Sequence, residues 1–101
     1  MMPTLRQPAV AGRFYPEDTE RMARELAHYV PIPSHTEDVL AVVLPHAGWM
    51  FSATIAGAVL TQVNVPERVV VMCPNHTGLG SRRSVWARGS WQLPGCAVPV
   101  D

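Results

Sequence analysis

The sequence predicts an α/β fold built around a βαβ unit with parallel strands. Two predominantly apolar runs rich in β-branched residues, 39–44 and 68–73, are typical of strands buried on both faces. Between them, apolar residues recur at helical spacing on one face: Ile55, Ala56, Val59, Leu60 and Val63. Strand, helix and strand within ~35 residues imply a right-handed crossover between parallel strands.

Prolines and apolar spacing predict the elements that precede this unit. A helix is expected to begin near Pro16, since acidic residues at 17, 18 and 20 suit its first turn. Its apolar face consists of Met22, Leu26, Tyr29 and Val30. Pro31 and Pro33 should end this helix, and the stretch to Asp38 is expected to be an exposed loop.

The second helix and the last third of the chain are predicted from caps and turns. Ser52 can cap the second helix, which Asn64 and Pro66 should close. Arg88-Gly89 is expected to be the turn of a hairpin, and residues 97–101 to begin another extended segment.

Composition limits the class of protein and its partners. The chain has 101 residues, 48% of them hydrophobic, and its 8 basic and 8 acidic residues cancel. One small globular unit is expected, with no nucleic-acid partner and no attraction to an anionic membrane. No apolar run reaches ~18 residues, and residues 1–8 lack the apolar core of a signal peptide, so a cytoplasmic location is expected.

Two histidines are the candidate functional residues. His46 and His76 follow the two predicted strands by two and three residues, in loops that contain proline and glycine. Ligands collect at the carboxyl ends of parallel strands, and neighbouring strands lie ~5 Å apart. Both imidazoles could therefore bind one ion, since imidazole is a ligand for iron, copper and zinc. The spacing also permits two unrelated loop histidines.

The other histidines and the two cysteines are expected to have ordinary structural roles. His28 lies in a surface-type helix and His35 in the proline-rich loop. Cys73 and Cys96 do not make a disulfide framework and are interpreted as reduced, partly buried thiols. Dinucleotide and phosphate loops, the Gly-x-Ser-x-Gly elbow and the Cys-x-x-Cys motif are all absent from the sequence.

Three separated motifs carry a resemblance to a known family. Arg6 with Ala11-Gly12-x-Phe14-Tyr15-Pro16, then Pro45-His46-Ala47-Gly48-Trp49, then Pro74-Asn75-His76-Thr77-Gly78 resemble the Memo family in order and spacing. Its bacterial and archaeal members are called AmmeMemoRadiSam system protein B. The terminal segment 97–101 is also similar to a family segment. The resemblance covers essentially all of the chain but only the N-terminal part of the family's single domain.

The resemblance implies a metal site within a larger mixed-sheet domain related to class III extradiol dioxygenases. Its ligands would be His46, His76 and a cysteine beyond Asp101, which neither Cys73 nor Cys96 matches. Iron or copper is the implied metal, and oxidoreductase chemistry the implied activity, with a small-molecule or peptide ligand. A non-catalytic peptide- or protein-binding module and an inactive truncated fragment are the alternatives. Whether the protein is an enzyme stays open.

Two departures from the family pattern affect these expectations. Many relatives have a second histidine directly after the one that matches His76, whereas this chain has Thr77, which removes a candidate acid–base group. Many relatives also read Thr-Pro-Leu-Gly before the terminal match, where this chain has 93–96, Leu-Pro-Gly-Cys. A segment of 101 residues should also bind metal weakly and expose apolar faces, so we expect it to be poorly soluble, oligomeric through these faces, or inactive.

Overall fold

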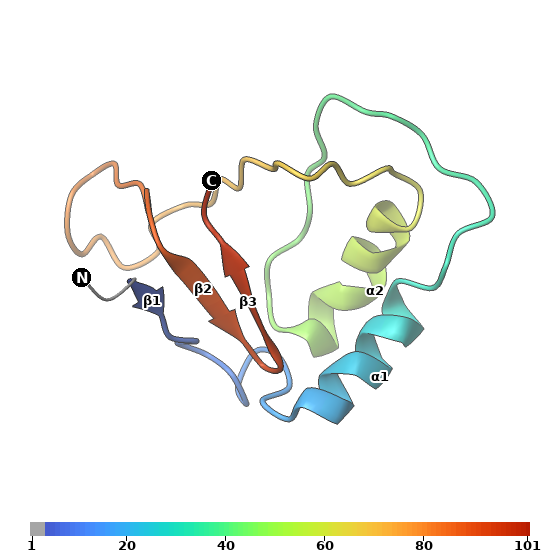
Figure 1. The fold of residues 1–101 in the computed structure, drawn as a ribbon, viewed down its shortest axis with the longest axis horizontal. Coiled ribbons are helices and arrows are strands. Elements are labelled where there is room, and N and C mark those ends of the chain that lie inside the picture. Colours follow the sequence, from blue (N-terminus) through green and yellow to red (C-terminus); the bar gives the residue numbers. More distant parts are fainter. Residues whose placement is uncertain (1–3) are drawn as a thin grey trace.

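Two helices lie side by side at one end of the molecule, and a small sheet lies at the other (Figure 1). The computed structural model describes residues 4–101. Its helices are α1, Thr19–Tyr29, and α2, Trp49–Leu60. Its strands are β1, Leu5–Arg6, β2, Ser90–Leu93, and β3, Cys96–Pro99. The fold is therefore a small α/β arrangement, as predicted at that level.

Helix α1 forms where its apolar face predicts it. Asp18 caps its N-terminus, since a carboxylate oxygen of Asp18 accepts a hydrogen bond from the backbone N–H of Arg21 at 2.8 Å. The backbone N–H of Val30 donates to the carbonyl of Leu26 at 2.8 Å, and the helix ends there, before Pro31. Met22 is buried and forms part of the small core.

Helix α2 begins three residues before the predicted cap. Gly48 occupies the N-cap position without a side-chain hydrogen bond, and the backbone N–H of Trp49 donates to the carbonyl of Phe14 at 2.8 Å. A contact distant in the sequence thus replaces the expected cap, Ser52. The two helices meet at Gly57, where a Cβ atom would overlap the carbonyl of Tyr29. Ala53 is buried beside this contact region on the same helix.

The sheet has the order β1-β2-β3 and is mixed. Strand β1 runs parallel to β2, and β2 runs antiparallel to β3. The β2–β3 hairpin turns at Pro94-Gly95, where Gly95 has φ +87°, a conformation that favours glycine. The predicted hairpin turn at Arg88-Gly89 was therefore wrong. Residues 97–99 are extended in β3, which agrees with the expectation for that segment.

The two strands of the predicted βαβ unit are not formed. Residues 39–44 and 68–73 run as extended connections on either side of α2, without a ladder of backbone hydrogen bonds in the described part of the chain. A strand needs a neighbour to receive its hydrogen bonds, and neither segment lies in the observed sheet. The nearest pairing is an isolated bridge between Glu37 and Val63. The parallel pair of this structure is β1 and β2 instead.

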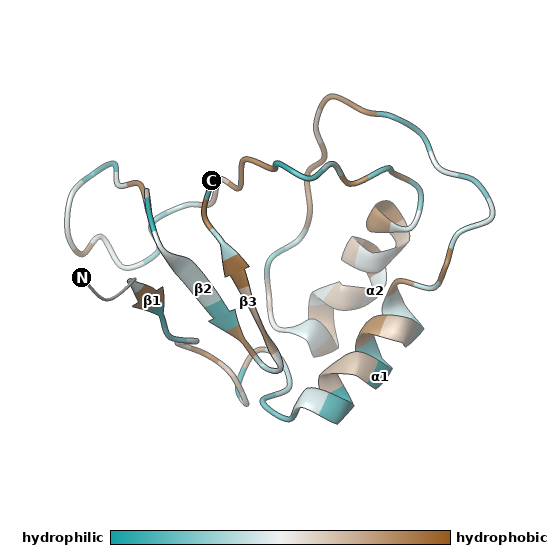
Figure 2. Cartoon of the chain, viewed as in Figure 1, coloured by the Kyte–Doolittle hydropathy of each residue, from teal (hydrophilic) through white to brown (hydrophobic). Residues whose placement is uncertain are grey.

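Apolar side chains along these two segments are exposed to solvent. The exposed fraction is 102% for Leu40 and 89% for Met72, and Val43 and Val70 are also highly exposed. Figure 2 shows hydrophobic colour along parts of both extended segments. The buried apolar core of residues 4–101 consists of Met22 and Ala53. No helix in this range is long and apolar enough to cross a bilayer.

Candidate metal centre

The structure brings the two predicted histidines together. The Nε2 atoms of His46 and His76 lie 3.1 Å apart, and the two rings stack with centroids 5.0 Å apart and an interplanar angle of 27°. Both side chains are exposed. At this distance one ring can donate an N–H to the lone pair of the other, with the roles set by the tautomers. The pairing comes from two loops, although the strands expected to precede them are absent.

The separation of the two nitrogens fits a pair of ligands to one ion. Imidazole nitrogens bind such ions at ~2.0–2.1 Å. Two nitrogens sharing an ion then lie about 2.9 Å apart at a right angle and about 3.4 Å apart at a tetrahedral angle. The observed 3.1 Å between His46 and His76 falls between these values. The donor set, two imidazoles, also suits iron or copper.

The His46 loop is held from the side of α2. The hydroxyl of Ser52 donates to the carbonyl of Ala47 at 2.8 Å and lies 3.2 Å from the carbonyl of Gly48. Ser52 is buried, with 5% of its surface exposed. On the other side, Gly48 packs against the backbone of Phe14. The residues that follow His46 are thus tied both to a helix and to the turn at 11–15.

The His76 loop is held by its own side chains. Asn75 donates from its amide nitrogen to the carbonyl of Leu79 at 2.9 Å. The amide oxygen of Asn75 accepts from the backbone N–H of Gly78 at 3.0 Å and from the hydroxyl of Thr77 at 3.3 Å. Gly78 has φ +69°, which closes the turn without strain. His76 lies inside this hydrogen-bonded loop.

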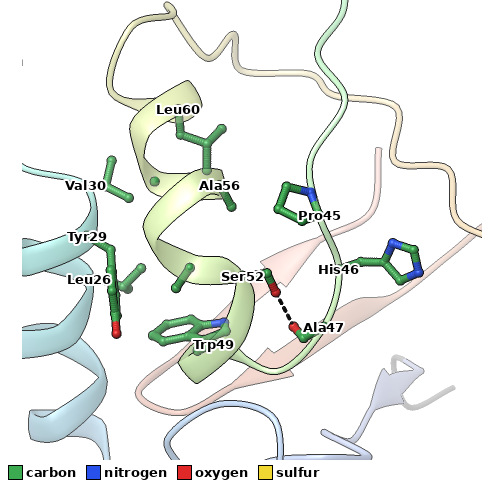
Figure 3. Close-up of a pocket in the computed structure, with 12 residues that line it drawn as sticks. Leu26, Tyr29, Val30, Pro45, His46, Ala47, Trp49, Ser52, Ala56 and Leu60 are labelled. Atoms are coloured by element: carbon green, nitrogen blue, oxygen red, sulfur yellow. Dashed lines mark hydrogen bonds between the residues drawn. The ribbon is translucent and has the colours of Figure 1, made fainter.

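A cavity of about 230 Å³ lies next to the His46 loop, between α1 and α2. Tyr29, Trp49 and Leu60 are among the residues that line it. Figure 3 shows the His46 ring pointing away from α2, whereas the Ser52 hydroxyl is turned toward Ala47. His46 also contributes to the lining of this cavity, while its Nε2 atom contacts that of His76.

Other candidate donors do not join the pair. Within residues 4–101, no group of three His, Cys, Asp or Glu side chains is arranged to hold a metal ion. His28 stacks edge-on against Tyr29, with ring centroids 5.1 Å apart. Cys73 and Cys96 are free thiols, as expected, but both are exposed rather than partly buried.

Sequence reasoning missed the two residues that hold the histidine loops. Ser52 was expected to cap a helix, and Asn75 was named only as a member of the motif Pro74-Asn75-His76-Thr77-Gly78. Serine and asparagine often hydrogen-bond to nearby backbone groups, so their positions beside the histidines were the available signal. The Ser52 hydroxyl donates to the carbonyl of Ala47 because α2 begins at Trp49, which places Ser52 in its first turn. Local sequence did not indicate that start.

The sequence matches the family described as Memo-like protein over residues 6–101. The chain belongs to the Memo-like protein family. It is 38% identical over 98 residues to a MEMO1 family protein of Aquifex aeolicus (strain VF5), covering 96% of this chain and 37% of that protein. A MEMO1 family protein of Methanosarcina mazei is 40% identical over 98 residues, covering 96% of this chain and 36% of its own.

A MEMO1 family protein of Methanopyrus kandleri is similar to the chain to the same extent. It is 38% identical over 109 residues, which cover 95% of this chain and 38% of the relative. The chain thus spans little more than a third of the length of the curated relatives it matches. No solved structure shows a significant match to it.

Proposed function

We propose that His46 and His76 are two protein ligands of an iron or copper centre in a Memo-like protein with oxidoreductase chemistry. The observation that carries this proposal is the 3.1 Å separation of their Nε2 atoms. Two loop histidines 30 residues apart have no structural need to face each other, and both are exposed to solvent. A shared ion accounts for their convergence, and the donor type agrees with the metals that the family resemblance implies.

The two histidines are an incomplete ligand set. Open metal sites usually have three protein ligands, and the described residues supply two. We propose that the third is a cysteine outside residues 1–101, in a single mixed-sheet domain related to the extradiol dioxygenases. A bound iron or copper ion would supply redox and Lewis-acid chemistry to a small-molecule or peptide ligand. The role of His46 and His76 would be to bind that ion and fix its position.

Metal content of the full-length protein tests this proposal. Replacing both histidines, His46→Ala with His76→Ala, should remove most of the bound iron or copper measured by mass spectrometry of the purified protein. The matched control replaces His28 and His35, which lie in α1 and in the loop after it. That control should keep its metal. Unchanged metal content in the His46/His76 variant would refute the proposal.

Exposed apolar side chains favour a second candidate, a peptide- or protein-binding module without catalysis. Leu40, Val43 and Met72 offer apolar contact area near the histidine loops. This candidate predicts a partner whose affinity survives loss of both histidines, whereas a metal-dependent ligand would be lost with them. A protein that has neither bound metal nor such a partner would match the third alternative, an inactive fragment.

A further inference from the structure

We infer that Asn75 and Ser52 are positioning residues that hold His76 and His46 face to face before any ion binds. This inference rests on the proposed metal role of the two histidines. Each side chain is engaged with backbone groups close in sequence to its histidine. Both act on the loops, and the loops set where the imidazoles lie.

Asn75 uses its whole side-chain amide to close the loop around His76. The nitrogen donates to the carbonyl of Leu79, and the oxygen accepts from the N–H of Gly78 and the hydroxyl of Thr77. Thr77 adds a further bond, accepting from the N–H of Leu79 at 3.3 Å. Every one of these contacts lies within residues 75–79, and the loop is exposed. The side chain of Asn75 therefore shapes this loop while contributing little to the packing of the helices.

Ser52 performs the matching task for His46 from a rigid element. It lies in α2, it is buried, and its hydroxyl donates to the carbonyl of Ala47, the residue directly after His46. The His46 loop is thus attached to a helix that packs on α1. With Asn75 closing the other loop, a side-chain hydrogen bond fixes the backbone beside each histidine. Groups that orient metal ligands typically change metal affinity 10–100-fold when they are removed.

The test compares variants of Asn75 in the full-length protein, with Co(II) alone as the probe. Asn75→Ala should weaken Co(II) binding about 10-fold and leave the melting temperature of the metal-free protein nearly unchanged. Asn75→Ser should restore most of the affinity, because a serine hydroxyl can accept the same backbone N–H. An aspartate is unsuitable as the rescue, since its charge would itself attract the cation.

Asn64 provides the matched control. It is also an exposed asparagine with side-chain hydrogen bonds, to Thr36 and to a carboxylate oxygen of Asp38 at 2.7 Å, but it lies in the connection after α2. Asn64→Ala should leave Co(II) affinity unchanged. Ser52→Ala should weaken Co(II) binding as well, but its buried position means that stability changes with it, so Asn75 carries the test.

The outcomes separate this inference from the proposed function. If loss of both histidines abolishes Co(II) binding while Asn75→Ala binds as the parent does, the positioning role is wrong and the metal role stands. An affinity loss in Asn75→Ala that serine does not rescue, or that Asn64→Ala reproduces, would also overturn it. If the histidine variant binds Co(II) as tightly as the parent, the proposed function itself fails.

Discussion

Helices α1 and α2 are in close contact at Gly57. The substitution Gly57→Ala should change the free energy of unfolding through two effects of opposite sign. In a helix, alanine is more favourable than glycine by ~1 kcal/mol. The added methyl group, however, would overlap the backbone carbonyl of Tyr29, which cannot rotate away. Overpacking of this kind typically costs about 1–3 kcal/mol. Because the obstacle is backbone, we expect the upper part of that range and a net destabilisation of about 1–2 kcal/mol.

Urea unfolding followed by tryptophan fluorescence measures this difference, since Trp49 lies in the helix pair beside Tyr29. For a chain of this size, each 1 kcal/mol corresponds to a melting shift of roughly 4–8 °C. Ala58→Gly is the control, because residue 58 is exposed in the same helix. It should cost ~1 kcal/mol from helix propensity alone. A Gly57→Ala variant more stable than the parent would refute the close packing of α1 on α2.

Two further changes test the helix cap and the uncovered segments. Asp18→Ala should destabilise the protein by about 1 kcal/mol, because the N–H of Arg21 loses its acceptor. Asp18→Asn should cost less, because an amide oxygen can still accept this hydrogen bond. Equal losses of stability in urea unfolding would contradict the capping role of Asp18. Leu40→Gln with Val43→Gln should change the unfolding free energy of the 101-residue chain by less than about 0.5 kcal/mol, since both side chains are exposed. The same double substitution should reduce self-association measured by light scattering. Unchanged self-association would show that Leu40 and Val43 are not part of the surface through which the chain associates.

The parts of the fold that local sequence predicts are those stabilised by local contacts. Helix α1 has an acidic N-terminus, one apolar face and a proline after it, and it forms between Asp18 and Val30. The start of α2 was misplaced because its first N–H is bonded to Phe14, 35 residues earlier. Nothing in the residues around Ser52 indicates that contact.

The strands could not be predicted from local sequence. The runs 39–44 and 68–73 have the composition of buried strands, but composition does not provide a neighbouring strand to pair with. Likewise, Gly89 and Gly95 both adopt positive φ, so two positions were suited to a hairpin turn. The pairing of β2 with β3 is what selects Pro94-Gly95. Residue patterns alone did not show which of the two glycines would lie between paired strands.

His46 and His76 lie together in the structure, but the two strands from which their proximity was predicted are not formed. Strand ends at one sheet edge were expected to bring His46 and His76 together, yet they meet without those strands. Local hydrogen bonds from Ser52 and Asn75 order the two loops instead. Burial of apolar side chains in 39–44 and 68–73 would contribute to stability, whereas the hydrogen bonds of Ser52 and Asn75 are made to the two histidine loops. Ring placement and domain stability should therefore respond to different substitutions.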